Sequence, residues 1–334
     1  MKPPTIYSIA EELGLSPATV SRSLNGSPRV TEKTRDRVLR AAENQGYIRN
    51  QQARALRQTS TRMIGLLVPD LTSEVFNVLA SCIQLELHER GYGLIIGQSL
   101  NQAELDRNYL QAFQSQKVDG ILHAPCTPHG VDDTFATVPV PVVEIIRESD
   151  GQPRDSFCNA DINDAVLLTS YLARRGYEEI FVVLGPQEFS SARLRGEGAG
   201  RVTAAHPGVA VHLCHGPFTE EWGYQVGAQV AAASQTGSAR VGIAVTSNTF
   251  MAGVLGALKD RGVRAPKDVG IVGMEDPNWY RVADPPITAV AGPTWELGKQ
   301  ASRKLLELIE DGQGAGPVTR TELHGVLRER ESTM

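Results

Sequence analysis

TIYSIAEELGLSPATVSRSLNG, residues 5–26, predicts two short helices separated by a tight turn. The apolar residues of the first helix recur at helical spacing: Ile6, Ile9, Ala10 and Leu13. Thr5 is a favourable N-cap for this helix, and Gly14 supplies the left-handed residue that ends it. Ser16 caps the second helix, and Pro17 occupies its first turn, where a missing N–H group costs nothing.

The second of these helices has an inner and an outer face. Val20 and Leu24, four residues apart, face the first helix. The opposite face is the one that a DNA groove would meet: Pro17, Ala18, Ser21, Arg22 and Asn25. Thr31 caps a third helix, which Gly46 closes and which carries three apolar residues inward: Val38, Leu39 and Ala42. The pattern predicts a small self-supporting core of three helices, although an ordinary helical hairpin would look similar.

Charge is distributed unevenly along the chain. Residues 1–62 contain 11 Lys and Arg against 5 Asp and Glu, whereas the remainder contains 22 against 33. A basic segment on an acidic body suits a phosphate-binding module joined to a part that does not bind nucleic acid. The overall net charge of −5 hides this division.

Length and composition set further limits. A chain of 334 residues that is 41% hydrophobic can fill one small and one large domain. No segment is apolar for long enough to span a bilayer, and the start, MKPPTIYS, lacks a signal-peptide core, so we expect a cytoplasmic protein with no membrane partner. The four cysteines form no CxxC pair, so we expect buried or idle thiols rather than a zinc site or disulfides.

From Met63 onward the pattern changes from helices alone to alternating strands and helices. Short apolar runs predict a first series of strands, IGLLVPD, GLIIGQS, DGILHAP and PVVEII, and then a second, IFVVLGP, VAVHLCH, VGIAVTS and VGIVGME. Helices are expected near residues 75–90, 104–116, 165–175, 221–233 and 250–261. Two successive series predict two doubly wound α/β lobes with parallel sheets and a ligand cleft at the carboxyl ends of the strands.

Over essentially its whole length the chain resembles the lactose-repressor (LacI) family of transcription regulators. The resemblance rests on residues 5–26 followed by VTEKTRDRVLRAAENQGYIRN, on the linker QQARALR, and on VTSNTFMAGVLGALKDRGVRAPKDVGIVGMEDP with PPITAV and ELGKQA. It implies an all-α helix-turn-helix head over residues 1–48, a hinge helix over 49–61, and a periplasmic-binding-protein-like core over 62–334. The core would divide into an N-lobe, about 62–160 and 291–322, and a C-lobe, about 161–290 and 323–334.

The resemblance also implies a homodimer, with a tetramer left open, whose two heads read a pseudo-palindromic operator in double-stranded DNA. Pro17, Ala18 and Arg22 would then face the bases, with further DNA contacts from the residues around them: Thr5, Ser16, Thr19, Ser21 and Asn25. The guanidinium fork of Arg22 matches both acceptors of a guanine, so Arg22 is the expected reader. A phosphate contact or a solvated side chain is the alternative.

The linker from Arg49 to Arg62 contains a short helix-forming run, Gln51 to Leu56, which is too short to stay helical alone in water. The resemblance implies that this run folds on operator DNA and enters the minor groove. Leu56 would wedge open a base step there, and Ala53 would lie where two hinges pack. A flexible basic tether remains the alternative.

Within the core, the resemblance implies an effector cleft between the lobes, with eight binding residues: Asp70, Phe76, Arg195, Phe218, Ser247, Asn248, Glu275 and Trp279. Aromatic rings beside Arg, Asn and carboxylate groups suit a sugar or a sugar acid. Glu275 replaces the aspartate that is more usual at its position. Structural roles stay open for some residues: Asp70 as a helix cap, Phe76 and Phe218 as core aromatics, and Glu144 beside the cleft or in solvent.

The remaining motifs predict no catalytic residue, no metal site and no cofactor. GEGAG at residues 196–200 lacks the preceding strand and the Lys of a phosphate loop. His212 and His215 alternate along a strand, so they need not converge on a metal. We expect a regulator, most simply a repressor, rather than an enzyme. A sugar-kinase-type α/β enzyme would leave the basic head unexplained, and a solute-binding protein would need an export signal.

Overall fold

The computed structural model describes residues 4–24, 27–47, 60–126, 140–150, 153–312 and 317–334. The chain forms two compact units, Met1–Thr61 and Arg62–Met334, which we call the head and the core. Three of the expected DNA-contacting residues lie outside the described residues: Asn25, Ala53 and Leu56. None of the helices in the described ranges combines the length and the apolar character needed to cross a membrane.

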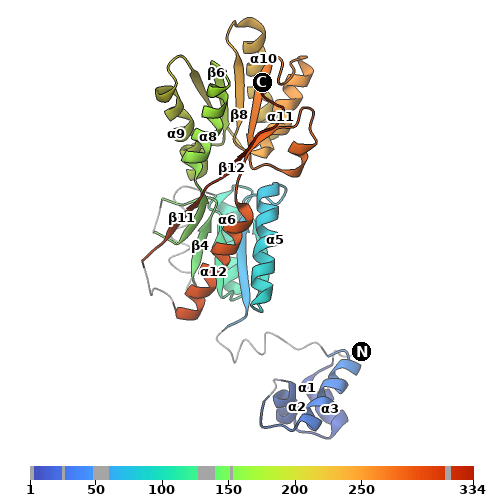
Figure 1. Cartoon of the computed structure of the whole chain (residues 1–334). Helices are drawn as coiled ribbons and strands as arrows, with labels where there is room; N and C mark the ends of the chain where they lie inside the picture. The colour runs from blue at the N-terminus through green and yellow to red at the C-terminus, as the bar shows by residue number, and fades with distance from the viewer. Residues whose placement is uncertain (1–3, 25–26, 48–59, 127–139, 151–152, 313–316) are drawn as a thin grey trace. The chain divides into compact units, whose positions relative to one another are not determined.

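The described head contains the three expected helices, α1 (Ile6–Leu13), α2 (Pro17–Leu24) and α3 (Glu32–Asn44) (Figure 1). The Thr5 hydroxyl accepts the N–H of Ser8 at 3.2 Å, and the Ser8 hydroxyl accepts the N–H of Thr5 at 3.0 Å, which completes a capping box. Gly14 ends α1 with φ of 63°, a conformation that favours glycine. The cap at Thr5 and the turn at Gly14 therefore form as predicted.

The head core consists of residues from all three helices, among them Ile9, Val20 and Val38. The expectation for Leu39 was wrong, because 38% of its surface is exposed. Adjacent helical residues point about 100° apart. Once Val38 faces inward, Ala41 and Ala42 complete the inner face of α3, and Leu39 lies beside it.

The first lobe of the core has a six-stranded, all-parallel sheet in the order β11-β5-β4-β3-β1-β2. Its strands are β1 (Met63–Val68), β2 (Gly93–Gln98), β3 (Gly120–His123), β4 (Val142–Ile145), β5 (Ser156–Asn159) and β11 (Arg320–Leu323). Its helices are α5 (Glu74–Glu89), α6 (Ala103–Ser115) and α12 (Thr294–Asp311). Helices α5 and α12 pack on one face, and α6 packs on the other.

The second lobe repeats this architecture with a six-stranded sheet in the order β12-β10-β9-β8-β6-β7. Its strands are β6 (Glu179–Leu184), β7 (Ala210–His215), β8 (Val241–Val245), β9 (Val269–Met274), β10 (Thr288–Ala291) and β12 (Val326–Arg328). Its helices are α8 (Asp161–Arg174), α9 (Ser190–Ala205), α10 (Glu220–Thr236), α11 (Asn248–Asp260) and the short 3-10 helix η1 (Asn278–Arg281). Helices α10 and α11 cover one face, and α8 and α9 cover the other.

Both sheets agree with the expected doubly wound fold, with one exception. The edge strand β12 pairs antiparallel with β10, whereas the other ladders of the second sheet are parallel. The chain passes between the lobes after β5, after β10, and again between β11 and β12 (Figure 1). Every residue of β8 and of β9 is buried, as expected for strands with helices on both faces.

Two helices of the second lobe approach each other closely through glycine. A Cβ atom on Gly253 of α11 would lie 1.9 Å from the carbonyl oxygen of Glu220 in α10. At Gly256 in the same helix, the nearest atom would be 3.8 Å away, on the Tyr224 ring. The packing of α10 on α11 therefore requires glycine at one of these positions and tolerates a methyl group at the other.

We predict opposite effects on stability from the two corresponding alanine substitutions. Gly253→Ala forces the helices apart and should lower the free energy of unfolding by about 1–3 kcal/mol. Gly256→Ala relieves the entropic cost of glycine in a helix and should raise it by about 0.5–1 kcal/mol. Urea denaturation of both variants beside the parent protein measures the difference, and equal effects would contradict the packing described here.

Candidate functional site

A cleft with a volume of about 550 Å³, open mouth included, lies at the carboxyl ends of the strands of both lobes. Asp70 follows β1, Arg147 follows β4, Ser247 follows β8 and Glu275 follows β9. Six of the residues expected from the sequence line this cleft: Asp70, Phe76, Arg195, Phe218, Ser247 and Glu275. Parallel strands bring their carboxyl ends to one edge, so residues far apart in sequence meet there.

Arg195 of α9 is held by a buried ion pair. Its Nε donates to the Asp161 carboxylate at 2.7 Å, and its Nη1 donates to the carbonyl oxygen of Thr246 at 2.6 Å. Arg195 is 7% exposed, and Asp161 is 3% exposed. The guanidinium is therefore fixed in direction at the cleft wall, with its charge compensated from behind.

Glu275 presents its carboxylate from a strained turn. Its φ is 81° and that of Asp276 is 48°, both in the left-handed region that side chains usually avoid. Arg330 pairs with Asp276, and the N–H of Asn248 donates to Glu275 Oε2 at 2.9 Å. Burial raises the pKa of Glu275, and nearby Arg195 opposes that rise.

Asp70 and Phe218 each have a structural role and also lie at the cleft. Asp70 Oδ1 accepts the N–H of Thr72 at 2.8 Å, which shapes the turn before α5, and Asp70 also lines the cleft. The Phe218 ring stacks on Phe250 with centroids 5.7 Å apart. A Cβ atom on Gly185 would lie 2.2 Å from the Phe218 ring, so glycine leaves the room that this ring occupies. Phe218 therefore packs against the core of the second lobe and also lines the cleft.

Two of the expected binding residues, Trp279 and Asn248, are not among the residues that line the cleft. Trp279 lies in η1, where its ring meets Tyr280 edge-on at 4.6 Å and packs against the core of the second lobe. Asn248 contributes its backbone N–H, which binds Glu275. Glu144 is not in solvent: it is 3% exposed, accepts the Ser149 N–H at 3.0 Å and is not among the residues that line the cleft. Burial raises the pKa of Glu144, which the Ser149 hydrogen bonds oppose.

Sequence reasoning missed several residues that line the cleft: Ser73, Asn101, Arg147, Ser191 and Thr249. Arg147 comes two residues after β4, the same offset at which Asp70 follows β1 and Ser247 follows β8. This shared offset was a usable signal, because residues just past a buried parallel strand gather at the ligand edge. The residue before it, Ile146, has φ of 64°, an unusual conformation for a β-branched residue.

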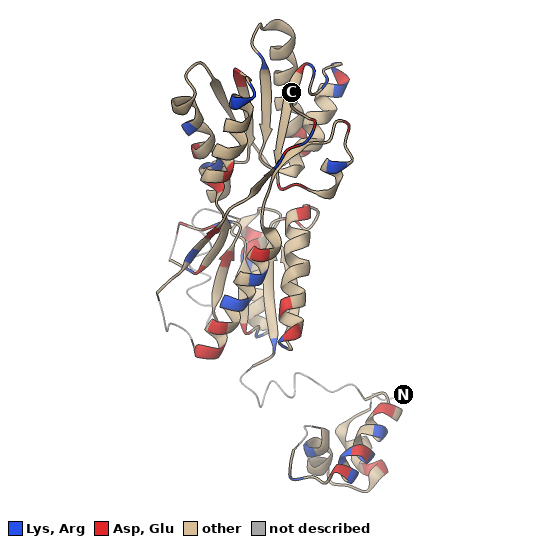
Figure 2. Ribbon diagram, in the orientation of Figure 1, with Lys and Arg blue, Asp and Glu red and all other residues tan. Residues whose placement is uncertain are grey.

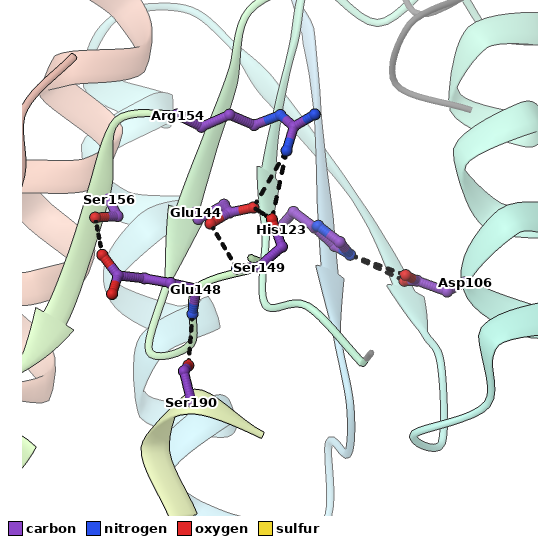
Figure 3. A network of polar contacts seen from close by, with 8 residues as sticks. All are labelled: Asp106, His123, Glu144, Glu148, Ser149, Arg154, Ser156 and Ser190. Atoms are coloured by element: carbon purple, nitrogen blue, oxygen red, sulfur yellow. Dashed lines mark hydrogen bonds and ion pairs between the residues drawn. The ribbon is translucent and has the colours of Figure 1, made fainter. Parts of the chain in front are cut away.

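The segment after β4 is anchored by the polar network in Figure 3. The N–H of Glu148 donates to the Ser190 hydroxyl of α9 at 2.8 Å, which ties the first lobe to the second. The Glu148 carboxylate accepts from the Ser156 hydroxyl at 2.6 Å. Behind β4, His123 and Asp106 form a buried contact at 3.0 Å. On the other side of Arg147, the Ile146 N–H donates to the carbonyl oxygen of Phe157 at 2.9 Å, so the backbone is held on both sides of Arg147.

In the head, the outer surface of α2 carries the exposed residues Pro17, Ala18 and Arg22, while Ser21 is half-buried. The Ser16 hydroxyl accepts the N–H of Thr19 at 3.1 Å, as expected of a cap. Figure 2 shows both signs of charge on the head helices. The described head has six basic residues, Arg22, Arg29, Lys33, Arg35, Arg37 and Arg40, and five acidic ones, Glu11, Glu12, Glu32, Asp36 and Glu43. Most of the positive excess of residues 1–62 therefore belongs to the linker.

The remaining polar candidates have ordinary partners. His212 pairs with Glu179 at 3.1 Å, and His215 Nδ1 lies 2.9 Å from the carbonyl oxygen of Gly185. Among the described residues, no group of three or more metal-binding side chains lies together. The cysteines are free, and burial raises the pKa of Cys126 to about 12 and that of Cys82 to about 11.

The Asp161 carboxyl predicts a pH dependence of core stability. Burial raises its pKa from 3.8 to about 6, although Arg195 opposes the shift. The folded protein then holds this proton more tightly than the unfolded chain does, so the contribution of Asp161 to stability falls as pH rises from about 4 to about 6. The stability of the parent relative to Asp161→Asn should fall across this window by on the order of 1–3 kcal/mol.

Urea denaturation at half-unit pH steps gives this difference. Asp311→Asn, at the exposed end of α12, is the matched control for the loss of a carboxylate. If the stability of the parent relative to Asp161→Asn instead rises with pH, the ion pair with Arg195, rather than burial, dominates the pKa of Asp161.

The head and the core each match a known protein family. Residues 5–50 match the sequence profile of bacterial regulatory proteins of the lacI family, and residues 169–333 match that of the periplasmic binding protein-like domain. The ribose operon repressor of Bacillus subtilis is 30% identical over 307 residues, which cover 92% of each chain.

Two solved structures are similar over nearly the whole chain. A lac repressor dimer bound to operator and the anti-inducer ONPF has a TM-score of 0.87 at 23% identity and covers 100% of both chains. The complex of the transcriptional regulator CelR with cellobiose has a TM-score of 0.71 at 25% identity and covers 98% of this chain and 99% of that one.

Proposed function

Because the chain belongs to the lacI family of bacterial regulatory proteins, we propose that it represses transcription by binding an operator and that a small-molecule effector controls this binding. The observation that carries the proposal is the pairing of two sites in one chain. The head exposes the outer surface of a second helix, and the core holds a cleft at the strand ends of two α/β lobes.

Operator reading is the role of α2. Pro17 and Ala18 have no side-chain hydrogen-bonding group, so they meet the bases by apolar contact, whereas Arg22 donates to a guanine. Thr5, Ser16, Thr19, Ser21 and Asn25 lie near phosphates. A homodimer places two such helices in successive major grooves, with a tetramer as a further assembly of the same dimers.

The linker completes the DNA-binding part. We assign residues 1–48 to DNA binding, 49–61 to a hinge, and the rest to effector binding and dimerisation. The hinge folds on the operator, with Leu56 entering the minor groove and Ala53 at the contact between two hinges. The basic residues of this stretch neutralise phosphates of any DNA and release the counterions bound there. The affinity for DNA should therefore fall steeply as the salt concentration rises.

The core binds a sugar or sugar acid. Phe76 and Phe218 offer apolar ring surfaces, while Arg195, Ser247 and Glu275 offer donors and acceptors for hydroxyl groups. The CelR structure holds a sugar, cellobiose, in a protein of similar fold. Binding shifts the population of lobe arrangements, which changes the spacing or order of the hinges. Release of DNA is the outcome that we expect.

The relatives are transcriptional repressors, and catalysis is no part of the proposal. The protein acts in the cytoplasm, where its operator lies. Random-sequence selection with the full chain, followed by fluorescence anisotropy, identifies the operator and tests repressor-type binding. Binding that shows no sequence preference would overturn the proposal.

Arg22→Ala should weaken operator binding by about 1–3 kcal/mol and relax the preference at one base position. Anisotropy titrations on the selected operator and on a scrambled duplex measure both effects. Arg40→Ala, on the exposed surface of α3, is the control for loss of one positive charge. Equal losses on both duplexes would instead make Arg22 a phosphate contact.

Arg195→Ala should abolish the thermal stabilisation that the effector gives and the effector's action on operator binding, because the hydroxyl-binding fork is lost. To find the effector, thermal unfolding of the full chain is measured with a set of sugars and polyols. A cooperative thermal unfolding transition of Arg195→Ala without ligand shows that this variant folds. If Arg195→Ala does not fold, Arg195→Lys is used instead, because it keeps the positive charge opposite Asp161. Normal effector response in both variants would contradict the position of this cleft.

A further inference from the structure

Arg147 is a buried charged residue of the cleft wall whose position is set by the first lobe. It follows β4 in the first lobe, is 5% exposed and lines the cleft. The neighbouring residue Glu148 fixes its backbone through the hydrogen bond to Ser190. The guanidinium is therefore placed by the fold rather than free to reach solvent.

Among the described residues, the hydrogen-bond partners of Arg147 are neutral. Its Nη1 donates to the Asn101 side-chain oxygen at 2.7 Å and lies 3.5 Å from the carbonyl oxygen of Pro125. Within the part of the chain that the structure describes, no carboxylate comes within ion-pair distance of it. Arg195, by contrast, meets Asp161 at 2.7 Å. A buried guanidinium without an anion is costly, because both hydration and charge compensation are missing.

Aromatic rings from the second lobe lie against Arg147. The guanidinium carbon is 4.3 Å from the Phe189 ring centroid and 4.9 Å from the Phe218 ring centroid. These rings attract the cation but cannot accept its in-plane hydrogen bonds. Nη1 binds Asn101, whereas Nε and Nη2 make no hydrogen bond to any described residue. These two groups form the edge of a guanidinium that matches a carboxylate.

The surrounding charges favour an anion of single charge. Burial and the nearby positive charge of Arg195 together lower the pKa of Arg147 to about 10, so the side chain is still protonated at neutral pH. Asp161 compensates Arg195, while Glu275 is the other carboxylate near both arginines. With Arg147, Arg195, Asp161 and Glu275 all ionised, the charges of these groups sum to zero, so a bound carboxylate adds one negative charge to the cleft, directly beside Arg147. A phosphate dianion would add excess negative charge beside Glu275.

We infer that the effector carries a carboxylate, bound edge-on by the Nε and Nη2 groups of Arg147. The ligand class is a sugar acid, with its hydroxyl groups at Arg195, Ser247 and Glu275. The inference rests on the proposed function, since it names the effector of the same cleft. It adds a specificity residue that neutral sugars would leave unsatisfied.

The test uses matched pairs of acid and neutral alcohol on the full chain: gluconate with glucitol, galactonate with galactitol, and ribonate with ribitol. Glucose 6-phosphate represents the phosphate source of negative charge. Calorimetry and thermal unfolding should show at least one aldonate binding roughly tenfold to hundredfold more tightly than its alditol, as expected for hydrogen bonds to a charged group. Arg147→Gln should remove this preference.

Arg175→Gln is the matched control, because Arg175 also lies over a ring, that of Tyr171 at 5.2 Å, but pairs with Glu329 at the surface. Arg147→Lys, which keeps the charge and loses the fork, should retain part of the preference and remains informative if the glutamine variant unfolds. Equal binding of acid and alcohol, preference for the phosphate, or unchanged preference in Arg147→Gln would overturn the inference. None of these results affects operator binding, whose own failure would overturn the proposed function.

Discussion

Each core sheet buries both of its faces under helices, and this constraint decides where polar chemistry can occur. Side chains within β8 and β9 have no access to solvent, so charged groups collect just beyond the strand ends. Because the ladders are parallel, those ends lie at one edge of each sheet, and the two edges border one cleft. The positions of Asp70, Arg147, Ser247 and Glu275 follow from this arrangement.

The lobes meet through specific polar contacts around the cleft. Asp150 pairs with Arg193 at 3.2 Å, and Glu74 accepts the N–H of Asn278 at 3.3 Å. Exposed pairs of this kind contribute little to stability, so they permit the lobes to shift. Arg147, whose guanidinium lies over the rings of Phe189 and Phe218, adds a buried contact to this set. A ligand that binds the guanidinium therefore acts directly on a contact between the lobes.

The strands and helices were predictable because apolar runs and caps are local signals. The eight apolar runs became β1–β4 and β6–β9, and Thr5, Gly14 and Thr31 end or begin helices as expected. No run was proposed for β5, β10, β11 or β12, and no range for α12, while two further outcomes concern the direction of a side chain. Leu39 is one residue beyond the inner face of α3, and the Trp279 ring packs edge-on against Tyr280. The helical spacing of Val38, Ala41 and Ala42 places Leu39 beside the inner face, whereas no spacing rule places the ring of Trp279.

The sequence by itself determined the class of the molecule: a capped helix-turn-helix, a basic linker, and two alternating strand–helix series, all of which depend on contacts between near neighbours. Only the tertiary structure decided which charges are compensated. Arg195 and Arg147 look alike in sequence, yet one meets Asp161 and the other meets neutral groups. That difference arises from side chains brought together from separate strands and helices, which a linear pattern does not record.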